Sequence, residues 1–456
     1  MYGIAAPGYH RKPAPESLAL LTSLTFVDLS YTPLSDAAPL RGIPHLVLDY
    51  TNIADVSPLA DSKILVLRSC TSIVDVRPLR NVDTIDLSAC DQLTNVSALG
   101  AVRDLNLSKT KVSDVSQLGA VHTLCLSACD WLIDVSALGG VQNLDLSWCC
   151  YVRDVSNLGA VPNLNLSQCD KITDFSALAH CHTLDVSACD IHSAAARGLA
   201  GVKVLSLSRC FQSQGIDDDA VAVLGGCTTI DLSNCNKITN VSALAHCHTV
   251  NLSFCDRLED LAPLRHVHDL VLKGCKKVQD VSALGGVSGG TVHTLDLSCC
   301  PVLANVSALG TVRNLDLSEC NSLWDVSALG TVHTLKLRGC KRLTDVKALA
   351  TVQDLDLSES AVTNVGMLGD VPVLNLSSTK VRDVSGLGKS NRVLNMTSCE
   401  QLVTVDSLSA VMDLNLSRCP KIRDVSALGG VFKLCISDSD AIEDVKCLRM
   451  VHHLIM

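Results

Sequence analysis

The string HTLDLS at residues 293–298 places three side chains with catalytic chemistry close together. His293 could act as a general base, Ser298 as a nucleophile and Asp296 as the carboxylate that orients the imidazole, which is the set that a hydrolase uses. A catalytic site is assembled once in a chain, whereas this string and its variants recur from end to end. Because no copy has a local distinction that would activate its serine, we predict no catalytic residue and a protein that is not an enzyme.

The string belongs to a repeat whose common core is L-x-L-S-x-C. The repeat occurs about 22 times, mostly at steps of 19 to 21 residues. Its leading apolar residues are Val27, Leu46, Leu65, Ile85, Leu105, Leu124, Leu144, Leu164, Leu184, Leu205, Ile230, Val250, Leu270, Leu295, Leu315, Leu335, Leu355, Leu374, Leu394, Leu414, Leu434 and Leu454. We therefore expect a single array over residues 16–456, after a poorly ordered lead-in at residues 1–15.

Each repeat has two parts with different periods. In VHTLDLS, apolar and polar residues alternate, so Val292, Leu295 and Leu297 are expected to point inward, with Thr294, Asp296 and Ser298 outward, as in a short strand. The DVSALG that follows suits a capped 3₁₀ or single helical turn ended by glycine. One strand and one turn cannot bury their own apolar side, so the repeats must stack.

This pattern resembles the leucine-rich repeat family, whose L-x-x-L-x-L-x-x-[N/C]-x-L signature is matched by Val292, Leu295, Leu297 and Cys300 and by their equivalents in nearly every repeat. The DVSAL turn is similar to that of internalin-like and phosphatase-regulator repeats. The cysteine and the long repeat at 210–227 are similar to cysteine-containing repeats of F-box proteins. The resemblance implies an α/β solenoid: a horseshoe with a parallel concave β-sheet and a convex side of 3₁₀ turns or short helices.

The chain contains 23 cysteines, and most share one column of the repeat. Thr32, Thr51, Thr110, Ser360, Thr379 and Ser439 fill that column elsewhere. Because Cys, Thr and Ser are all small and carry a donor hydrogen, we predict that they satisfy buried backbone carbonyls rather than form disulfides. Asn106, Asn165, Asn251, Asn375, Asn395 and Asn415 lie in N-x-S/T sequons within predicted strands, where a glycan would obstruct the sheet. Both observations favour a reducing, cytoplasmic location.

Two patterns could bind metals. Aspartates recur in one outward column, but the glycine-rich nonapeptide of calcium-binding β-helices is absent. Two HCH triplets surround Cys181 and Cys247, but both cysteines fall in the inward valine column, and neither has a second Cys or His pair at zinc-finger spacing. We predict no metal site and no cofactor.

Candidate contact residues lie where the columns change. Cations replace the usual Ser or Asp at Arg68, Lys273, Lys336 and Arg338. Lys336 and Arg338 are expected near Asp316 and Asp356, so they either compensate local charge or anchor an acidic partner segment. Large aromatics precede the cysteine column at Tyr31, Tyr50, Trp148 and Phe254, and aromatics and arginine are the usual anchors of interfaces.

Two repeats are longer, with inserts at 211–220 and 286–290. The first is acidic and then apolar, which predicts a true helix from about Asp217; the second, within GGVSGGTV, predicts a flexible loop. The chain stops at VHHLIM inside a strand motif, so end-to-end association through an uncapped edge is a further expectation.

The formal net charge of −10 disfavours general nucleic-acid binding, and neither a signal peptide nor a membrane span is found in the sequence. We therefore expect a non-enzymatic protein–protein interaction scaffold whose partner binds the concave sheet face. The alternative is the substrate-recognition subunit of a ubiquitin ligase, although no helical F-box fits before residue 16.

Overall fold

The computed structural model describes residues 24–210, 215–286 and 289–456. The lead-in predicted at 1–15, and parts of both inserts, lie outside the described residues. The chain forms two compact units that meet in sequence between Asp231 and Leu232. Both are built from the same repeat.

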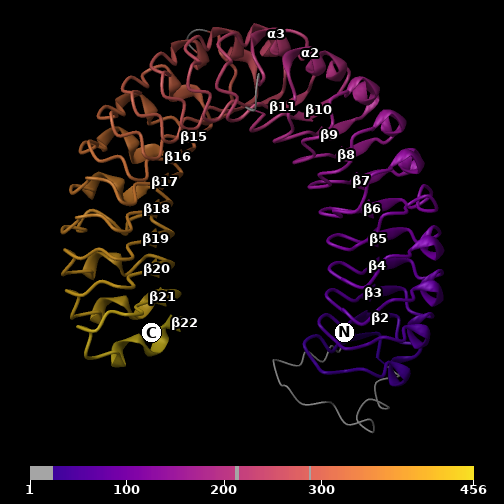
Figure 1. Ribbon diagram of the computed structural model, residues 1–456. Helices are drawn as coiled ribbons and strands as arrows, with labels where there is room; N and C mark the ends of the chain where they lie inside the picture. The colour runs from indigo at the N-terminus through magenta and orange to yellow at the C-terminus, as the bar shows by residue number, and fades with distance from the viewer. Residues whose placement is uncertain (1–23, 211–214, 287–288) are drawn as a thin grey trace. The chain divides into compact units, whose positions relative to one another are not determined.

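Each unit contains a sheet of parallel three-residue strands, and each strand pairs with the next in sequence (Figure 1). The N-terminal unit has β1 (Phe26–Asp28), β2 (His45–Val47), β3 (Ile64–Val66), β4 (Thr84–Asp86), β5 (Asp104–Asn106), β6 (Thr123–Cys125), β7 (Asn143–Asp145), β8 (Asn163–Asn165), β9 (Thr183–Asp185), β10 (Val204–Ser206) and β11 (Thr229–Asp231). The C-terminal unit has β12 (Thr249–Asn251), β13 (Asp269–Val271), β14 (Thr294–Asp296), β15 (Asn314–Asp316), β16 (Thr334–Lys336), β17 (Asp354–Asp356), β18 (Val373–Asn375), β19 (Val393–Asn395), β20 (Asp413–Asn415), β21 (Lys433–Cys435) and β22 (His453–Ile455).

The leading apolar residues predicted from the sequence are the central residues of these strands, and they pair with one another, for example Leu270 with Leu295. Apart from Leu454 in the last strand, which is half-buried, they are buried, and so is the second Leu of the L-x-L pairs. The core therefore consists of stacked Leu, Val, Ile and Cys side chains, which explains how 3% aromatic residues suffice; Phe175 is a buried aromatic at the valine position of the DVSALG turn.

Short 3₁₀ and α-helical segments lie on the side of each unit opposite the strands (Figure 1). In the N-terminal unit they are η2 (Ala38–Leu40), η3 (Ser57–Leu59), η4 (Arg77–Leu79), η5 (Ser97–Leu99), η6 (Ser136–Gly140), η7 (Ser156–Leu158), η8 (Ser176–His180), α2 (Ser193–Ala196), η9 (Arg197–Leu199) and α3 (Asp218–Val221). In the C-terminal unit they are η10 (Ser242–His246), η11 (Ala262–His266), η12 (Ser282–Leu284), η14 (Leu309–Thr311), η15 (Ser327–Leu329), η16 (Lys347–Thr351), η17 (Gly366–Asp370), η18 (Asp406–Leu408), η19 (Ser426–Gly430) and η20 (Lys446–Met450). Among the described residues, no helix is long and apolar enough to cross a membrane.

The capped turn predicted for DVSALG is present. In η6, Asp134 accepts a hydrogen bond from the backbone N–H of Ser136 at 2.9 Å, and this contact recurs in other repeats. Glycine ends the turn at Gly100 and Gly159, as expected, and both residues have right-handed backbone at the ends of η5 and η7. A Cβ atom at Gly139 would clash with the carbonyl oxygen of Asn157 in the next repeat, so the glycine permits close stacking.

The helix predicted from about Asp217 is confirmed as α3. Asp217 is its N-cap and accepts a hydrogen bond from the N–H of Ala220 at 3.2 Å. The sequence analysis did not anticipate α2, which His192 caps through its ring nitrogen Nδ1.

Candidate binding surface

The strand face, which is the surface formed by the outward side chains of the strands, shows what HTLDLS does. Asp296 accepts a hydrogen bond from the backbone N–H of Ser298 at 2.8 Å, and His293 Nδ1 lies 3.3 Å from Thr294 Oγ1. Ser298 was expected to point outward, yet only 5% of it is exposed, because this small side chain is shielded by its larger neighbours. The hydrogen bonds of His293 and Asp296 therefore serve their own strand and do not form a relay to a serine.

The Asp296–Ser298 contact is repeated along both units, with Asp or Asn as the acceptor. All six sequon asparagines make it, with distances of 2.9 to 3.1 Å: Asn106, Asn165, Asn251, Asn375, Asn395 and Asn415. The side chain satisfies the N–H of the second residue after the strand, such as Ser298, whereas the N–H groups of Leu297 and Cys299 donate to carbonyl oxygens of the next repeat. The Asp/Asn column thus has a structural role that does not require a ligand.

The cysteine column donates hydrogen bonds to buried carbonyls, as predicted. The Cys149 thiol lies 3.1 Å from the carbonyl oxygen of Leu126, and Cys320 lies 3.1 Å from that of Leu297, in each case in the preceding repeat. Thr51 and Thr110 bond instead to carbonyls three residues earlier in their own repeats, at 2.8 and 2.7 Å. Burial raises the pKa of the column thiols, for Cys169 to about 12. These thiols are therefore neutral donors.

The four aromatic candidates lie in a column with left-handed backbone. Tyr31, Tyr50, Trp148 and Phe254 have φ angles of 60°, 57°, 63° and 59°, and all four are exposed. Gly, Ala, Ser, Lys, Glu and other unbranched residues fill this column elsewhere, because a β-branched side chain is the least tolerated at positive φ. Tyr31 and Tyr50 stack with their ring centroids 4.7 Å apart.

Three of the four cationic candidates form ion pairs within the chain. Arg68 Nε lies 2.7 Å from Asp86 Oδ2, and Arg338 lies 2.7 Å from Glu359. Lys336 Nζ lies 3.5 Å from Asp316, its neighbour on β15. The local charge compensation suggested by the sequence is thus present at these positions. Lys273 is different, because it is exposed and forms no ion pair with any described residue.

The structure distributes the predicted contact residues over both units and brings one useful pair together. Tyr31, Tyr50, Arg68 and Trp148 lie in the N-terminal unit. In the C-terminal unit, Phe254 and Lys273 follow the adjacent strands β12 and β13, and the N–H of Phe254 donates to the carbonyl of Lys273 at 2.7 Å. Lys336 and Arg338 lie farther along the same unit, at β16.

A group that the sequence analysis missed lies at the start of these same strands. The rings of His248, His268 and His293 form a stack, with successive centroids 4.7 Å apart. Asp269 lies beside the first two rings, 3.1 Å from His268 Nδ1 and 3.8 Å from His248 Nδ1. The signal in the sequence is a histidine two residues before the leading apolar residue in three successive repeats. We call the surface carrying His248, His268, His293, Phe254 and Lys273 the β12–β14 face.

The cysteines of the two HCH triplets are core residues, as predicted. Cys181 and Cys247 are buried in the inward valine column, with 1% and 2% exposure. His248, however, belongs to the second triplet and faces the next repeat rather than its own cysteine. Its partners His268 and Asp269 are about twenty residues away in sequence, so a search for ligands within the triplet could not find them.

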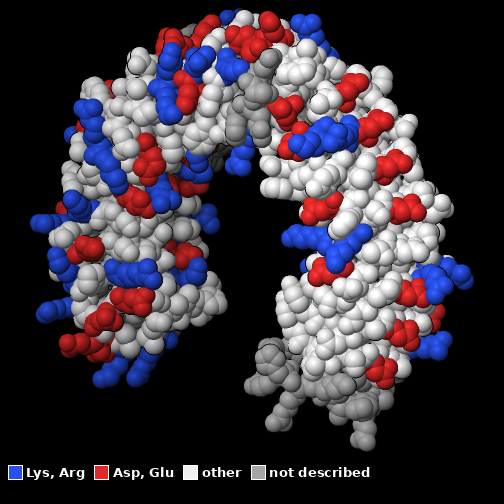
Figure 2. Space-filling view, in the orientation of Figure 1, with Lys and Arg blue, Asp and Glu red and all other residues white. Residues whose placement is uncertain are grey.

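Charged residues of both signs lie on the face of each unit seen in Figure 2. On the face of each unit seen in Figure 2, Lys and Arg side chains are interspersed with Asp and Glu rather than gathered into one basic area. The shallow hollow on the strands of the N-terminal unit is lined by Thr, Asn, Asp and Leu residues of β6 to β9.

Comparisons with known proteins support the fold. No protein-family model matches the chain, and no curated protein matches it in sequence. Among solved structures, the chain is similar to the one described as the TLR13–ssRNA13 complex, with a TM-score of 0.64 and 16% sequence identity over 96% of this chain and 71% of that chain. It is also similar to the mouse RP105/MD-1 complex, with a TM-score of 0.53 and 15% identity over 86% of this chain and 78% of that chain.

Both neighbours are leucine-rich repeat proteins, and the parallel strands with 3₁₀ turns opposite them are typical of that architecture. The chain has a leucine-rich-repeat solenoid fold, as its sequence predicted. At 15% and 16% sequence identity, the similarity supports the same fold but does not identify a ligand.

Proposed function

We propose that this protein is a non-enzymatic binding scaffold that takes a protein partner on its strand face, with the β12–β14 face as the centre of contact. The observation that carries the proposal is the pair formed by Phe254 and Lys273, an exposed aromatic beside an exposed cation that is unpaired among the described residues. Aromatic and cationic side chains are over-represented among the anchors of protein interfaces. At most other positions of the strand face, small polar residues repeat and offer little to distinguish one partner from another.

The chemistry of this face indicates the kind of segment it binds. A partner that places an apolar side chain against the Phe254 ring can place a carboxylate near Lys273, since the two residues end neighbouring strands. Because Lys273 has no competing carboxylate among the described residues, such a contact does not first have to break an ion pair. A partner carboxylate that binds Arg68, Lys336 or Arg338 must first break an ion pair within the chain. These three residues are therefore weaker anchors.

A protein partner fits better than a nucleic acid. The solved neighbours are described in complexes with an ssRNA and with MD-1, so relatives in fold take both classes of ligand. The formal net charge of −10 opposes phosphate binding, and counterion release needs clustered Lys and Arg. An oligonucleotide is therefore the control ligand in the test below.

We also propose an intracellular, reducing location. The proposal rests on cysteines such as Cys149 and Cys320, whose thiols donate hydrogen bonds to carbonyl oxygens, and on the sequons, whose asparagine side chains are needed to accept hydrogen bonds after the strands. The ubiquitin-ligase alternative stays a prediction from the sequence, and a stable cullin-type complex recovered with the native protein would support it.

The test compares matched variants in affinity capture from cell lysate, followed by crosslinking mass spectrometry. We expect F254A/K273E to lose the partner that the wild-type chain captures. W148A/K109E changes an aromatic and a lysine of the same left-handed column in the N-terminal unit, and it should retain the partner. Equal loss in both variants, or crosslinks confined to the N-terminal unit, would refute the proposed site. Salt-dependent binding of a single-stranded oligonucleotide would refute the proposal that the partner is a protein.

A further inference from the structure

We propose that His248, His268 and Asp269 form a binding site for one divalent transition-metal ion of the Zn²⁺ class. Among the described residues, they are the one group of three or more His, Cys, Asp or Glu side chains whose ligand atoms all lie within 4.8 Å of one another. The site lies on the β12–β14 face, but it takes a different ligand and its test does not use Phe254 or Lys273, so this proposal and the proposed function can fail separately.

The backbone places the ligands in register. Thr249 pairs with Asp269 across β12 and β13, so the residues before them, His248 and His268, are neighbours on adjacent strands. The N–H groups of His268 and Asp269 both donate to the carbonyl oxygen of His248 at 3.0 Å. These contacts fix the Cα positions of all three ligands before any ion arrives, which reduces the ordering that binding requires.

The distances between ligand atoms suit a common ion. His268 Nδ1 lies 3.1 Å from one carboxylate oxygen of Asp269, and His248 Nδ1 lies 3.8 Å from the other. Zinc bonds of about 2.0–2.2 Å in a tetrahedron separate neighbouring ligands by roughly 3.3–3.5 Å, which falls between these two values. The side chains are 62%, 46% and 35% exposed, so the rings can rotate to close on an ion and leave its fourth position to water.

The same column shows what sets these residues apart. At His248, His293 and His333, Nδ1 lies 3.3 Å from the hydroxyl of the next residue, a threonine, but His248 Nδ1 also lies 3.8 Å from Asp269 Oδ2. At His268 the next residue is aspartate, and the preceding repeat supplies a second histidine. Two imidazoles and a carboxylate favour Zn²⁺, Ni²⁺ or Cu²⁺ over Mg²⁺ or Ca²⁺, which prefer oxygen ligands. Each neutral ring binds the ion through the lone pair of Nδ1, in the tautomer that carries its single ring proton on Nε2, so the ring gives up no proton.

Zn²⁺ binding to the full-length chain under reducing conditions tests the site. We expect one equivalent of Zn²⁺ bound through nitrogen and oxygen ligands by X-ray absorption, and no competition from Mg²⁺. H248A, H268A and D269N should each weaken binding on the order of tenfold or more, whereas H333A, a histidine of the same column, should leave it unchanged.

All four substitutions are at the surface, so thermal unfolding without metal should match that of the wild-type protein. Zn²⁺ should raise the unfolding temperature of the wild type and of H333A. It should have less effect on the unfolding temperatures of H248A, H268A and D269N. Sulfur ligands in the absorption spectrum, no bound equivalent, or equal affinity in H248A, H268A and the wild type would each overturn the proposal.

Discussion

The ring of Phe254 lies over Gly274 in the next repeat, so that a Cβ atom at position 274 would be 2.5 Å from Cδ1 of the ring. Gly274 has a φ of 70° in the column that carries the exposed aromatics. The absence of a side chain there thus fixes where the proposed anchor can lie. The aromatic and the glycine form one structural feature shared by two repeats.

Replacing Gly274 with alanine should therefore move the Phe254 ring. The left-handed backbone costs about 1–2 kcal/mol for a residue with a Cβ, and the clash with the ring adds to it. We expect lower stability in urea unfolding and weaker partner binding. Gly339→Ala is the matched control, because its φ is 72° and its Cβ would meet the flexible Glu319 carboxylate instead. If G339A weakens partner binding as much as G274A does, the position of the Phe254 ring does not determine partner binding.

The sequence predicts the repeat register well and the contacts between repeats poorly, for a physical reason. Burial of Leu295 and its equivalents follows from alternation within one strand, and the hydrogen-bonding role of Cys149 follows from its interchange with threonine in the same column. The contact between His268 and His248 depends on which residues stacking brings together twenty positions apart. The left-handed backbone at Phe254 depends on a dihedral angle that residue type alone does not specify, since most of that column is not glycine.

The thiol–carbonyl contact at Cys320 provides a test of the buried column. Cys320→Ala removes a donor from the carbonyl oxygen of Leu297 and leaves a small void, and we expect a loss of about 1–3 kcal/mol in the free energy of unfolding. Cys320→Ser keeps a donor and should cost less. Cys299→Ala, at a half-buried position outside the column, should be near neutral. Equal losses for Cys299→Ala and Cys320→Ala would mean that the hydrogen bond from Cys320 to Leu297 contributes nothing to the free energy of unfolding.

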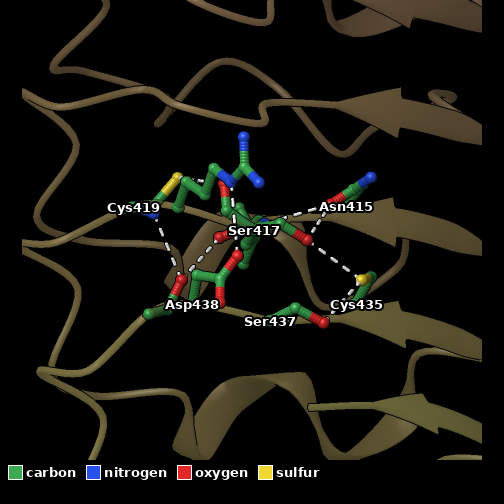
Figure 3. A network of polar contacts seen from close by, with 9 residues as sticks. Asn415, Ser417, Cys419, Cys435, Ser437 and Asp438 are labelled. Atoms are coloured by element: carbon green, nitrogen blue, oxygen red, sulfur yellow. Dashed lines mark hydrogen bonds and ion pairs between the residues drawn. The ribbon is translucent and has the colours of Figure 1, made fainter.

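Cys435 should be the most reactive thiol in the part of the C-terminal unit drawn in Figure 3. It lies 3.0 Å from Ser417 Oγ and 3.6 Å from Ser437 Oγ. Although partial burial raises the pKa of its thiol, its hydrogen bonds with these serines and the charge of Lys433 together lower that pKa. The nearby Cys419 is buried and donates to the carbonyl oxygen of Met396, and burial raises its pKa to about 12.

Labelling of the folded chain with a thiol reagent at neutral pH should accordingly modify Cys435 before Cys419, by on the order of 100-fold or more in rate. Ser417→Ala removes one hydrogen bond that favours the thiolate, so it should slow the reaction of Cys435 and leave that of Cys419 unchanged. Faster labelling of Cys419, as read by peptide mass spectrometry, would show that the column opens more readily than its burial implies.

The capped turns should make the fold sensitive to acid. Hydrogen bonds from the hydroxyl and N–H of the following serine lower the pKa of Asp134 and Asp174 from its usual value of 3.8, and Asp154 behaves alike. Because the folded pKa is below the unfolded one, the ionised caps stabilise the fold above about pH 4. That contribution is lost as the pH falls through the folded pKa.

The chain itself contains the control for this effect, since Asn95, Asn240 and Asn305 cap their turns in the same way at 3.0 to 3.1 Å without titrating. D134N/D154N/D174N should therefore fold like the wild type at pH 7 and lose less stability than the wild type below pH 4. Urea unfolding at a series of pH values, followed by circular dichroism, measures the difference. Parallel loss of stability in the variant and the wild type would mean that acid acts elsewhere, because an asparagine cap cannot be protonated in this range.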